Sequence, residues 1–386
     1  MRVLRSAAVV RLGLVLCFTV GIGCAAALPP PRPPIPRPPP LPAQTMRMHV
    51  IDVGQGDAIL LEFPCAAALV DTGGEKNTLF DSTGALLAYL DAFFERRTDL
   101  ARTLKLLVIS HPHIDHTRGI PALLERYKVE NVVDNGEESS SGQDQVRALH
   151  AAIKERGLKH HAVQLAEIPP RGLLSNGIID PIACKDVDPR LRVAWGSVAE
   201  DPGWGKGRFG KRPFDNQNNH SVVVRVDFGK ASALLTGDLE EQAIGALVAR
   251  YRGSGLLDVD VYKVGHHGSW NGTTEDLLAA MTPQVAVISS GAPERRLAWT
   301  AWKFGHPRAS TVDLLRRFVR RPREPIKALV ADGVEDFAER DLDVAVYGTP
   351  WDGTVIVELS SDGKIEVRTG RQAGKVEKAA QAAPSS

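Results

Sequence analysis

The chain has 386 residues, of which 43% are hydrophobic and 24% are charged, and its formal net charge is +1. This composition is typical of a soluble globular protein, and the length suits one large catalytic domain or two small ones. The near-neutral charge excludes a global basic bias toward nucleic acid, so an anionic substrate would need a local patch or bound metal.

The first 27 residues have the pattern of a secretory signal peptide. A basic segment precedes a short apolar run over 14–22, and three alanines at 25–27 offer a small-residue cleavage site. Because the run is too short for a comfortable membrane crossing, we expect a secreted or periplasmic protein with no stable span. Cys24, which follows a small residue, leaves a lipid anchor as an alternative.

Two further segments border the folded part of the chain. Residues 28–44 form a proline-rich linker, expected to be extended, and 371–386 form a polar tail, expected to be disordered. The predicted catalytic domain is therefore 45–370. Its cysteines, Cys65 and Cys184, either pair in an oxidising compartment or are two unrelated buried thiols, and sequence alone does not give their distance.

The first half of the domain alternates short apolar runs with helical patterns. The helical pattern at 81–97 begins with an Asp-Ser cap. The expected order is strands 46–53, 58–63 and 67–73, helix 81–97, strand 104–110, helix 118–128 and strand 129–135.

The second half repeats this alternation after a different kind of segment. Residues 136–217 are rich in Gly, Ser, Pro and charge and have weak periodicity, which predicts a variable insert ending in a loop. Two successive halves of strands and helices indicate an α/β fold with sheets sandwiched between helices. The expected order is strands 221–229 and 231–238 in a hairpin, helix 240–251, strand 258–265, helix 274–281, strand 284–291, helix 310–319 and a hairpin over 353–370.

The strongest functional signal is HPHIDHTRG, which directly follows the predicted strand 104–110. His111 and His113 are two residues apart and can approach one ion, while Asp115 and His116 come round the turn toward a second. Imidazole and carboxylate groups suit zinc, manganese or iron. The alternative, a polar loop with surface histidines, rarely places four such residues at one strand end.

Other candidate ligands border apolar runs elsewhere in the chain. Asp71, Asp238 and the pair His266–His267 follow predicted strands, and His220 precedes one. Taken singly, Asp238 could instead cap the helix at 240–251, and an isolated histidine such as His220 is more often structural. Their shared position at strand ends predicts that they complete two metal sites.

These motifs resemble the metallo-β-lactamase superfamily. HPHIDH resembles its H-x-H-x-D-H signature, and LVDTG and LTGD match two further motifs. IDVGQGDAILLE, NNHSVVVRVDFG, LLTGDLE, YKVGHHGS and FGHP, in that order, resemble the extracellular domain of ComEC-type competence proteins. The resemblance implies a four-layer αββα sandwich. Two departures stand out: ComEC-like proteins commonly have Asp where this chain has His113, and ComEC proper carries many membrane spans.

The resemblance also implies roles for individual residues. Asp115 is an expected catalytic residue as well as a ligand, and His306 in FGHP would contact substrate phosphate or donate a proton at the cleft rim. Asp57 and Asp71 would lie near the metals and orient the ligands. The implied ligands are His111, His113 and His220 for the first metal, Asp115, His116 and one of His266 and His267 (preferably His266) for the second, and Asp238 as a bridge.

The implied chemistry is hydrolysis with two divalent ions, zinc being favoured over manganese. The ions would share a bridging water, lower its pKa and so supply hydroxide near neutral pH. A phosphodiester such as nucleic acid is the favoured substrate. The loop with Lys206, Arg208, Lys211 and Arg212 around Trp204, Phe209 and Phe214 could assist, although a solvated loop is the simpler interpretation. The alternatives are an ester, thioester, lactone or β-lactam hydrolase and a non-catalytic metal-binding envelope protein.

Overall fold

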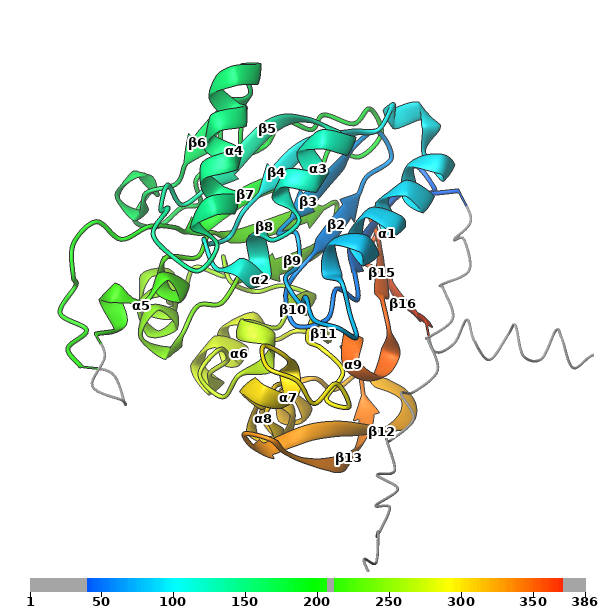
Figure 1. The fold of residues 1–386 in the computed structure, drawn as a ribbon, viewed down its shortest axis with the longest axis vertical. Coiled ribbons are helices and arrows are strands. Elements are labelled where there is room, and N and C mark those ends of the chain that lie inside the picture. The colour runs from blue at the N-terminus through cyan, green and yellow to red at the C-terminus, as the bar shows by residue number, and fades with distance from the viewer. Residues whose placement is uncertain (1–39, 207–211, 371–386) are drawn as a thin grey trace, which may run out of the picture. The chain divides into compact units, whose positions relative to one another are not determined.

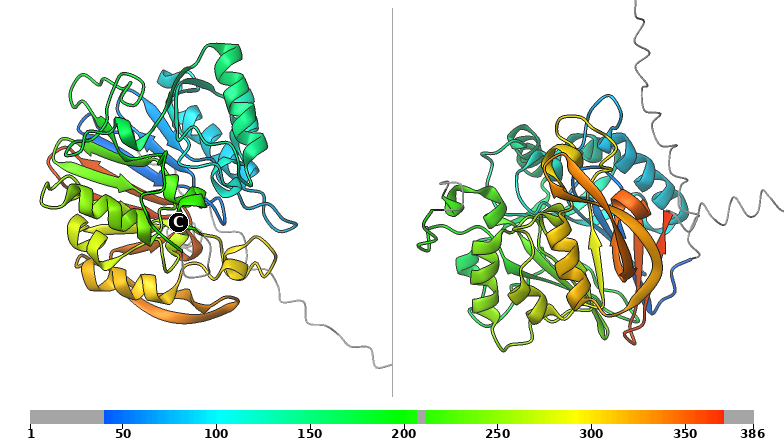
Figure 2. Two further views of the ribbon diagram at one scale, coloured as in Figure 1. Left: turned by 90° about the vertical axis from the view of Figure 1, so that its left-hand side faces the viewer. Right: turned by 90° about the horizontal axis from the view of Figure 1, so that it is seen from below.

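The computed structural model describes residues 40–206 and 212–370. The predicted signal peptide, Cys24, most of the proline-rich linker, the tail 371–386 and the loop residues Arg208, Phe209 and Lys211 lie outside the described residues. Two sheets lie face to face with helices on both outer faces, as the views in Figures 1 and 2 show. The predicted four-layer αββα sandwich is therefore confirmed.

The first sheet has eight strands in the order β16-β15-β1-β2-β3-β4-β5-β6. Neighbouring strands from β16 through β15, β1 and β2 to β3 pair antiparallel. Neighbouring strands from β3 through β4 and β5 to β6 pair parallel. The strands are β1 (Thr45–Val50), β2 (Ile59–Glu62), β3 (Ala67–Val70), β4 (Thr103–Val108), β5 (Lys128–Asp134), β6 (Lys159–Ala162), β15 (Val355–Ser360) and β16 (Ile365–Thr369).

The second sheet has six strands in the order β14-β11-β10-β9-β8-β7, and its β14–β9 part is parallel. A separate hairpin, β12–β13, lies at the edge of the domain. The strands are β7 (Arg190–Trp195), β8 (Val223–Phe228), β9 (Ala231–Leu235), β10 (Val261–Lys263), β11 (Val285–Ile288), β12 (Pro322–Gly333), β13 (Asp336–Val344) and β14 (Val346–Gly348).

The helices divide between the two outer faces (Figure 1). In α1, Leu86, Leu90 and Phe93 recur at helical spacing on the buried side, and Asp81 caps the start by accepting a hydrogen bond from Thr83 N. None of the helices in the described part of the chain is long and apolar enough to cross a membrane. Helices α1 (Ser82–Arg96), α3 (Ile120–Arg126) and α4 (Gln143–Arg156) cover the first sheet, and α5 (Glu241–Tyr251), α6 (Glu275–Met281) and α8 (Ala309–Phe318) cover the second.

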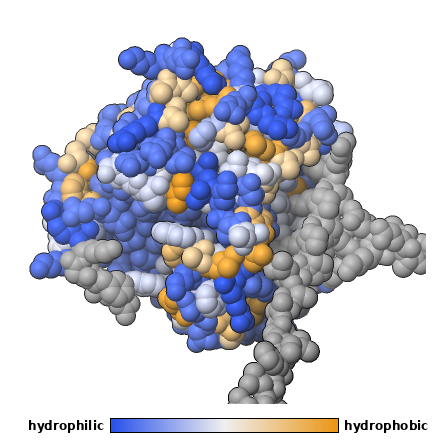
Figure 3. Space-filling model, in the orientation of Figure 1, coloured by the Kyte–Doolittle hydropathy of each residue, from blue (hydrophilic) through white to orange (hydrophobic). Residues whose placement is uncertain are grey.

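The domain has two hydrophobic cores, one between the two sheets and one between the first sheet and its helices, and alternate residues of a strand belong to different cores. In β2, Leu60 packs under the helices of the first sheet, whereas its neighbour Leu61 packs between the sheets. Successive side chains of a strand point to opposite faces, so a strand such as β2, which is buried on both faces, supplies both cores. The face of the domain in Figure 3 is accordingly mainly hydrophilic, with hydrophobic residues in small separate patches.

The segment 136–217 contains more regular structure than its weak periodicity predicts. It supplies α4, β6 and β7, and β6 pairs with β5 while β7 pairs with β8. The segment therefore provides one of the two edge strands of each sheet. The β12–β13 hairpin was likewise not predicted from the sequence.

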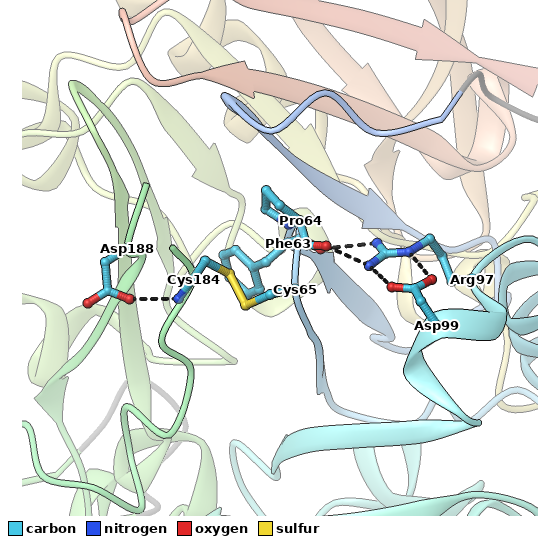
Figure 4. Close-up of a disulfide and its surroundings, with 7 residues drawn as sticks. All are labelled: Phe63, Pro64, Cys65, Arg97, Asp99, Cys184 and Asp188. Carbon is cyan, nitrogen blue, oxygen red and sulfur yellow. Dashed lines mark hydrogen bonds and ion pairs between the residues drawn. A yellow bond between two sulfur atoms is a disulfide. The ribbon is translucent and has the colours of Figure 1, made fainter. Parts of the chain in front are cut away.

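A disulfide between Cys65 and Cys184 resolves the alternative that the sequence left open (Figure 4). Cys65 lies in the turn between β2 and β3, and Cys184 lies in the segment leading to β7. The two Cα atoms are 5.5 Å apart, and the bond closes a sequence separation of 119 residues. It therefore ties the 136–217 segment to a turn of the first sheet.

We expect the double substitution Cys65→Ser/Cys184→Ser to lower the free energy of unfolding by about 2–4 kcal/mol, because a long closed loop restricts the unfolded chain. Urea denaturation of oxidised wild-type and variant protein, with metals chelated, measures the difference. Reduced wild-type protein is the control and should match the variant. Equal midpoints for oxidised wild type and variant would show that the cross-link contributes nothing.

Candidate metal centre

The carboxyl ends of three strands bring most of the predicted ligands to one edge of the sandwich. His111 and His113 follow β4 and precede the short helix α2 (Ile114–Thr117), which carries Asp115 and His116. Asp238 follows β9, and His266 and His267 follow β10. Functional side chains commonly gather where strands of α/β sheets end.

Four of these residues form one compact group. The Nε2 atom of His116 lies 3.2 Å from Asp238 Oδ2, and the Nε2 atom of His267 lies 3.3 Å from both Asp238 Oδ2 and Asp115 Oδ2. The four ligand atoms all lie within 4.8 Å of one another. Two imidazoles and two carboxylates form a donor set that suits zinc and other divalent ions.

The hydrogen bonding of this group fits a cation. His116 Nε2, His267 Nε2 and Asp238 Oδ1 are buried and have no hydrogen-bond partner. Buried polar atoms without a partner are costly, so three of them converging on one point require an explanation. A divalent ion coordinated by these atoms provides it.

His111 and His113 form a second, smaller group. His111 Nε2 lies 3.0 Å from His113 Nδ1, while His111 Nδ1 faces the hydroxyls of Ser110 and Ser221. Burial and the neighbouring His116 hold the pKa of His111 well below its ordinary value. The neutral imidazole is the form that binds metal. The pair can therefore supply part of the ligand set for a second metal ion.

The geometry of the group favours His267 over His266, the residue that the sequence led us to prefer. His267 is buried, and its Nδ1–H donates to the carbonyl oxygen of Ser289, which directs Nε2 toward Asp238. His266 is 18% exposed, and its Nε2 is 3.9 Å from Asp238. Both residues have positive φ, 48° and 52°, and this left-handed turn directs the second histidine inward.

The expectation for His220 is also corrected. Its Nδ1 accepts a hydrogen bond from Val198 N at 3.1 Å, and its Nε2–H donates to the carbonyl oxygen of Phe214 at 2.7 Å. Both ring nitrogens are thus used by the backbone. The next residue, Ser221, instead places its hydroxyl against His111 and Asp238 N.

Asp71 and Asp57 lie behind the ligands. Asp71 Oδ2 accepts hydrogen bonds from His116 Nδ1 and Ser110 Oγ, which fixes the orientation of the His116 ring. Asp57 forms a buried ion pair with Lys263. Nothing in the sequence indicated this role, because Lys263 lies within the otherwise apolar strand β10. Burial tends to raise the pKa of Asp57, but Lys263 and His267 outweigh it and lower that pKa.

A cleft of about 240 Å³ opens over the metal centre. His306 lies in its wall, and Gln55 Nε2 donates to His306 Nδ1 while Gln55 Oε1 accepts from Ser290, which fixes the amide. His306 therefore carries its proton on Nε2, and burial holds its pKa well below the ordinary value. A neutral imidazole donates a hydrogen bond but is a poor proton donor. Residues absent from the predicted site also line the cleft, including Arg118, Asn218, Trp299 and Phe304.

The predicted basic loop contributes less than its sequence indicates. Among its described residues, Arg212 pairs with Asp201 at 2.8 Å. Trp204 and Phe214 pack partly buried against the core. These three side chains are therefore engaged within the fold.

A separate cluster joins β5, α4 and β6. Asp134 Oδ2 lies 2.9 Å from His150 Nε2 and 3.0 Å from His160 Nε2, and Glu138 accepts from His150 Nδ1. The hydrogen bond to Asp134 and that to Glu138 raise the pKa of His150 to about 9, against the effect of burial. These contacts account for the arrangement as an ion-pair cluster.

The raised pKa predicts pH-dependent stability. The stabilisation by protonated His150 is complete below the unfolded pKa of about 6.5 and is lost as the pH rises through the folded value of about 9. Allowing for partial exposure, we expect His150→Gln to cost about 1–2 kcal/mol near neutral pH and almost nothing at about pH 10. Urea denaturation at several pH values tests this. A deficit that persisted at the higher pH would point to packing instead.

Comparison with known families now defines the class of protein. Residues 51–292 match the sequence profile of the Metallo-beta-lactamase superfamily, and the chain belongs to that superfamily. Members are mainly metal-dependent hydrolases, and the fold implies divalent metal ions.

Among curated proteins, the chain is similar to competence proteins, in agreement with the predicted ComEC-type resemblance. It is 27% identical to ComE operon protein 3 of Bacillus subtilis over 281 residues, covering 69% of this chain and 30% of that protein. It is 28% identical to Competence protein ComA of Neisseria gonorrhoeae over 244 residues, covering 63% of this chain and 26% of that protein. It spans less than a third of either relative.

Among solved structures, the metallo-beta-lactamase fold protein YhfI from Bacillus subtilis matches with 12% identity and a TM-score of 0.35, covering 63% of this chain and 85% of that one.

Proposed function

We propose that the protein is a metal-dependent phosphodiesterase. The observation that carries the proposal is the compact group of buried ligand atoms of His116, His267 and Asp238, joined by Asp115 at an open cleft, in which His116 Nε2, His267 Nε2 and Asp238 Oδ1 have no hydrogen-bond partner. A divalent ion held there would supply Lewis-acid polarisation of a substrate oxygen and a lowered pKa for water. The ligands that we propose are Asp115, His116, Asp238 and His267 for one ion, and His111 and His113 with Asp238 for a second, zinc being favoured over manganese.

The remaining residues would position the substrate. Arg118 lines the cleft, its Nε donates to Gly74 O, and among the described residues no carboxylate lies within ion-pair distance of it. An unpaired guanidinium suits a phosphate oxygen. The Nε2–H of His306 offers a neutral donor, and the Asp115 carboxylate, 27% exposed, can accept a hydrogen bond from water in the cleft and so orient it. The names of the competence relatives are in keeping with a substrate related to DNA.

We also propose that the protein is exported. The Cys65–Cys184 disulfide supports this proposal, since disulfides persist in oxidising compartments. Alkaline phosphatase fused after residue 45 should be active in the periplasm, and deleting residues 1–27 should abolish that activity. Equal activity without that segment would contradict export.

An assay panel on purified, metal-supplemented protein tests the activity. Single-stranded DNA and bis-p-nitrophenyl phosphate should be hydrolysed and nitrocefin should not. A chelator should abolish hydrolysis, and so should His111→Ala/His113→Ala. The control variant His161→Ala removes a histidine of β6 that pairs with Glu167, and it should behave as wild type.

Two outcomes would overturn the proposal. Hydrolysis of nitrocefin or of simple esters without cleavage of phosphodiesters would favour an acyl hydrolase. Stoichiometric bound metal with no hydrolysis of any substrate would favour a non-catalytic metal-binding protein.

A further inference from the structure

Trp299 is an exposed indole at the cleft. Its relative exposure is 67%, the highest of the three large hydrophobic side chains that stand exposed in the described part of the chain. The other two are Leu79 and Val334, neither of which lines the cleft. Because Trp299 lines the cleft, its exposed indole can contact a ligand that is bound there.

The backbone holds Trp299 in this position against its own preference. Its φ is +60°, a left-handed value that bulky residues rarely adopt. The surrounding loop is anchored, because Thr300 Oγ1 donates to Leu297 O at 2.7 Å and Arg295 Nε donates to the buried Glu75 carboxylate at 2.7 Å. Strain that a loop enforces in this way is characteristic of functional positions.

A series of rings leads from Trp299 to the metal centre. Trp299 contacts Phe304 in a T-shaped arrangement at 5.9 Å, and Phe304 stacks on His306 at 5.9 Å. His306 in turn stacks on His267 at 6.2 Å. In the T-shaped contact the planes of the Trp299 and Phe304 rings are 62° apart, and Trp299 keeps 67% of its surface exposed to solvent.

The cleft thus carries two kinds of recognition element. Arg118 offers charge to a phosphate, and Trp299 offers a planar apolar surface. A nucleotide unit combines an anionic phosphate with a planar ring system, and bases stack on aromatic side chains whatever their sequence. Inside a duplex both faces of each base are already stacked, so an unpaired base of a single strand is the better partner for the indole.

We propose that Trp299 is a base-stacking platform that selects phosphodiesters bearing an unpaired nucleobase, such as single-stranded nucleic acid. This inference rests on the proposed phosphodiesterase function. Trp299 acts as a binding residue, and it determines which phosphodiester is cleaved most efficiently.

The test compares two oligonucleotides of the same length, one single-stranded DNA with normal bases and one with abasic residues throughout. Metal-loaded wild-type protein should cleave the base-bearing strand with a kcat/KM about 10- to 100-fold higher. Trp299→Ala should collapse this preference toward unity, mainly through KM, and Trp299→Phe should retain part of it. Val334→Ala, an exposed control, should keep the wild-type preference. Bound metal is measured in every variant.

The outcomes separate the two proposals. If wild-type protein with bound metal cleaves neither oligonucleotide, the phosphodiesterase function fails. If it cleaves them but Trp299→Ala keeps the wild-type preference, or loses the same factor on both substrates, the stacking platform is refuted while the phosphodiesterase function stands.

Discussion

Asp238→Ala is expected to remove bound metal from both proposed positions and to lower hydrolysis by at least about 10³-fold, the factor expected when several kcal/mol of charge stabilisation are lost. Asp238 Oδ2 lies within 3.3 Å of the Nε2 atoms of both His116 and His267, and its Oδ1 is buried without a partner. No other residue contacts both histidines with a carboxylate in this way among the described contacts. Elemental analysis and the phosphodiesterase assay measure the two losses.

Comparison with two other variants sharpens this expectation. His111→Ala/His113→Ala should lose one metal ion per chain and keep the other, because the four-residue group remains intact. Asp341→Ala removes an exposed carboxylate on β13, 82% accessible, and should change neither metal content nor rate. Full metal content in Asp238→Ala would show that the centre is assembled around other atoms.

The arrangement of layers was predictable because it depends on periodicity that the sequence displays. The apolar runs at 46–53, 58–63 and 104–110 are β1, β2 and β4. The hairpin β12–β13 was missed since most of β13 faces solvent and only Leu342 in it is buried. Helix α4 was missed for the same reason: its buried side consists of Val146, Leu149 and Ala152 alone.

The ligands of the candidate centre were predictable where they are close together in the sequence. They were less predictable where the backbone conformation determines which side chain faces the site. The spacing of HPHIDH is visible in the sequence, and in the structure His113 and Asp115 line the cleft with Asp238 while His111 and His116 are buried beside them. The choice between His266 and His267 depends on two left-handed residues that no pattern reveals. His220 turns away because the 3₁₀-helix Gln217–His220 directs its ring to backbone groups. Trp299 lies in an irregular loop, where periodicity carries no information.

Gly74→Ala should disrupt the same centre without changing any ligand. A Cβ atom at Gly74 would lie 2.0 Å from Asp115 Cα and 2.8 Å from Asp115 N, and both are backbone atoms that no side-chain rotation can move aside. The loop that carries Asp115 and His116 is also held by Thr72 N, which donates to His116 O at 2.7 Å. The added methyl group must therefore push α2 away from Gly74, and so shift Asp115 and His116 relative to Asp238 and His267. A displacement of about 1 Å at such a site can cost 10²-fold in rate, and we expect at least that loss together with weaker metal binding.

Gly245→Ala is the matched control for this substitution. Gly245 lies on the exposed side of α5, and nothing lies within 4 Å of a Cβ atom added there. The same chemical change should leave metal content and rate as in wild type and stabilise the protein by about 0.5–1 kcal/mol through helix propensity. Metal titration by calorimetry, with urea denaturation in parallel, separates loss of the centre from loss of the fold. If Gly74→Ala binds metal as tightly as Gly245→Ala, the close packing of Gly74 on Asp115 does not control the position of the ligands.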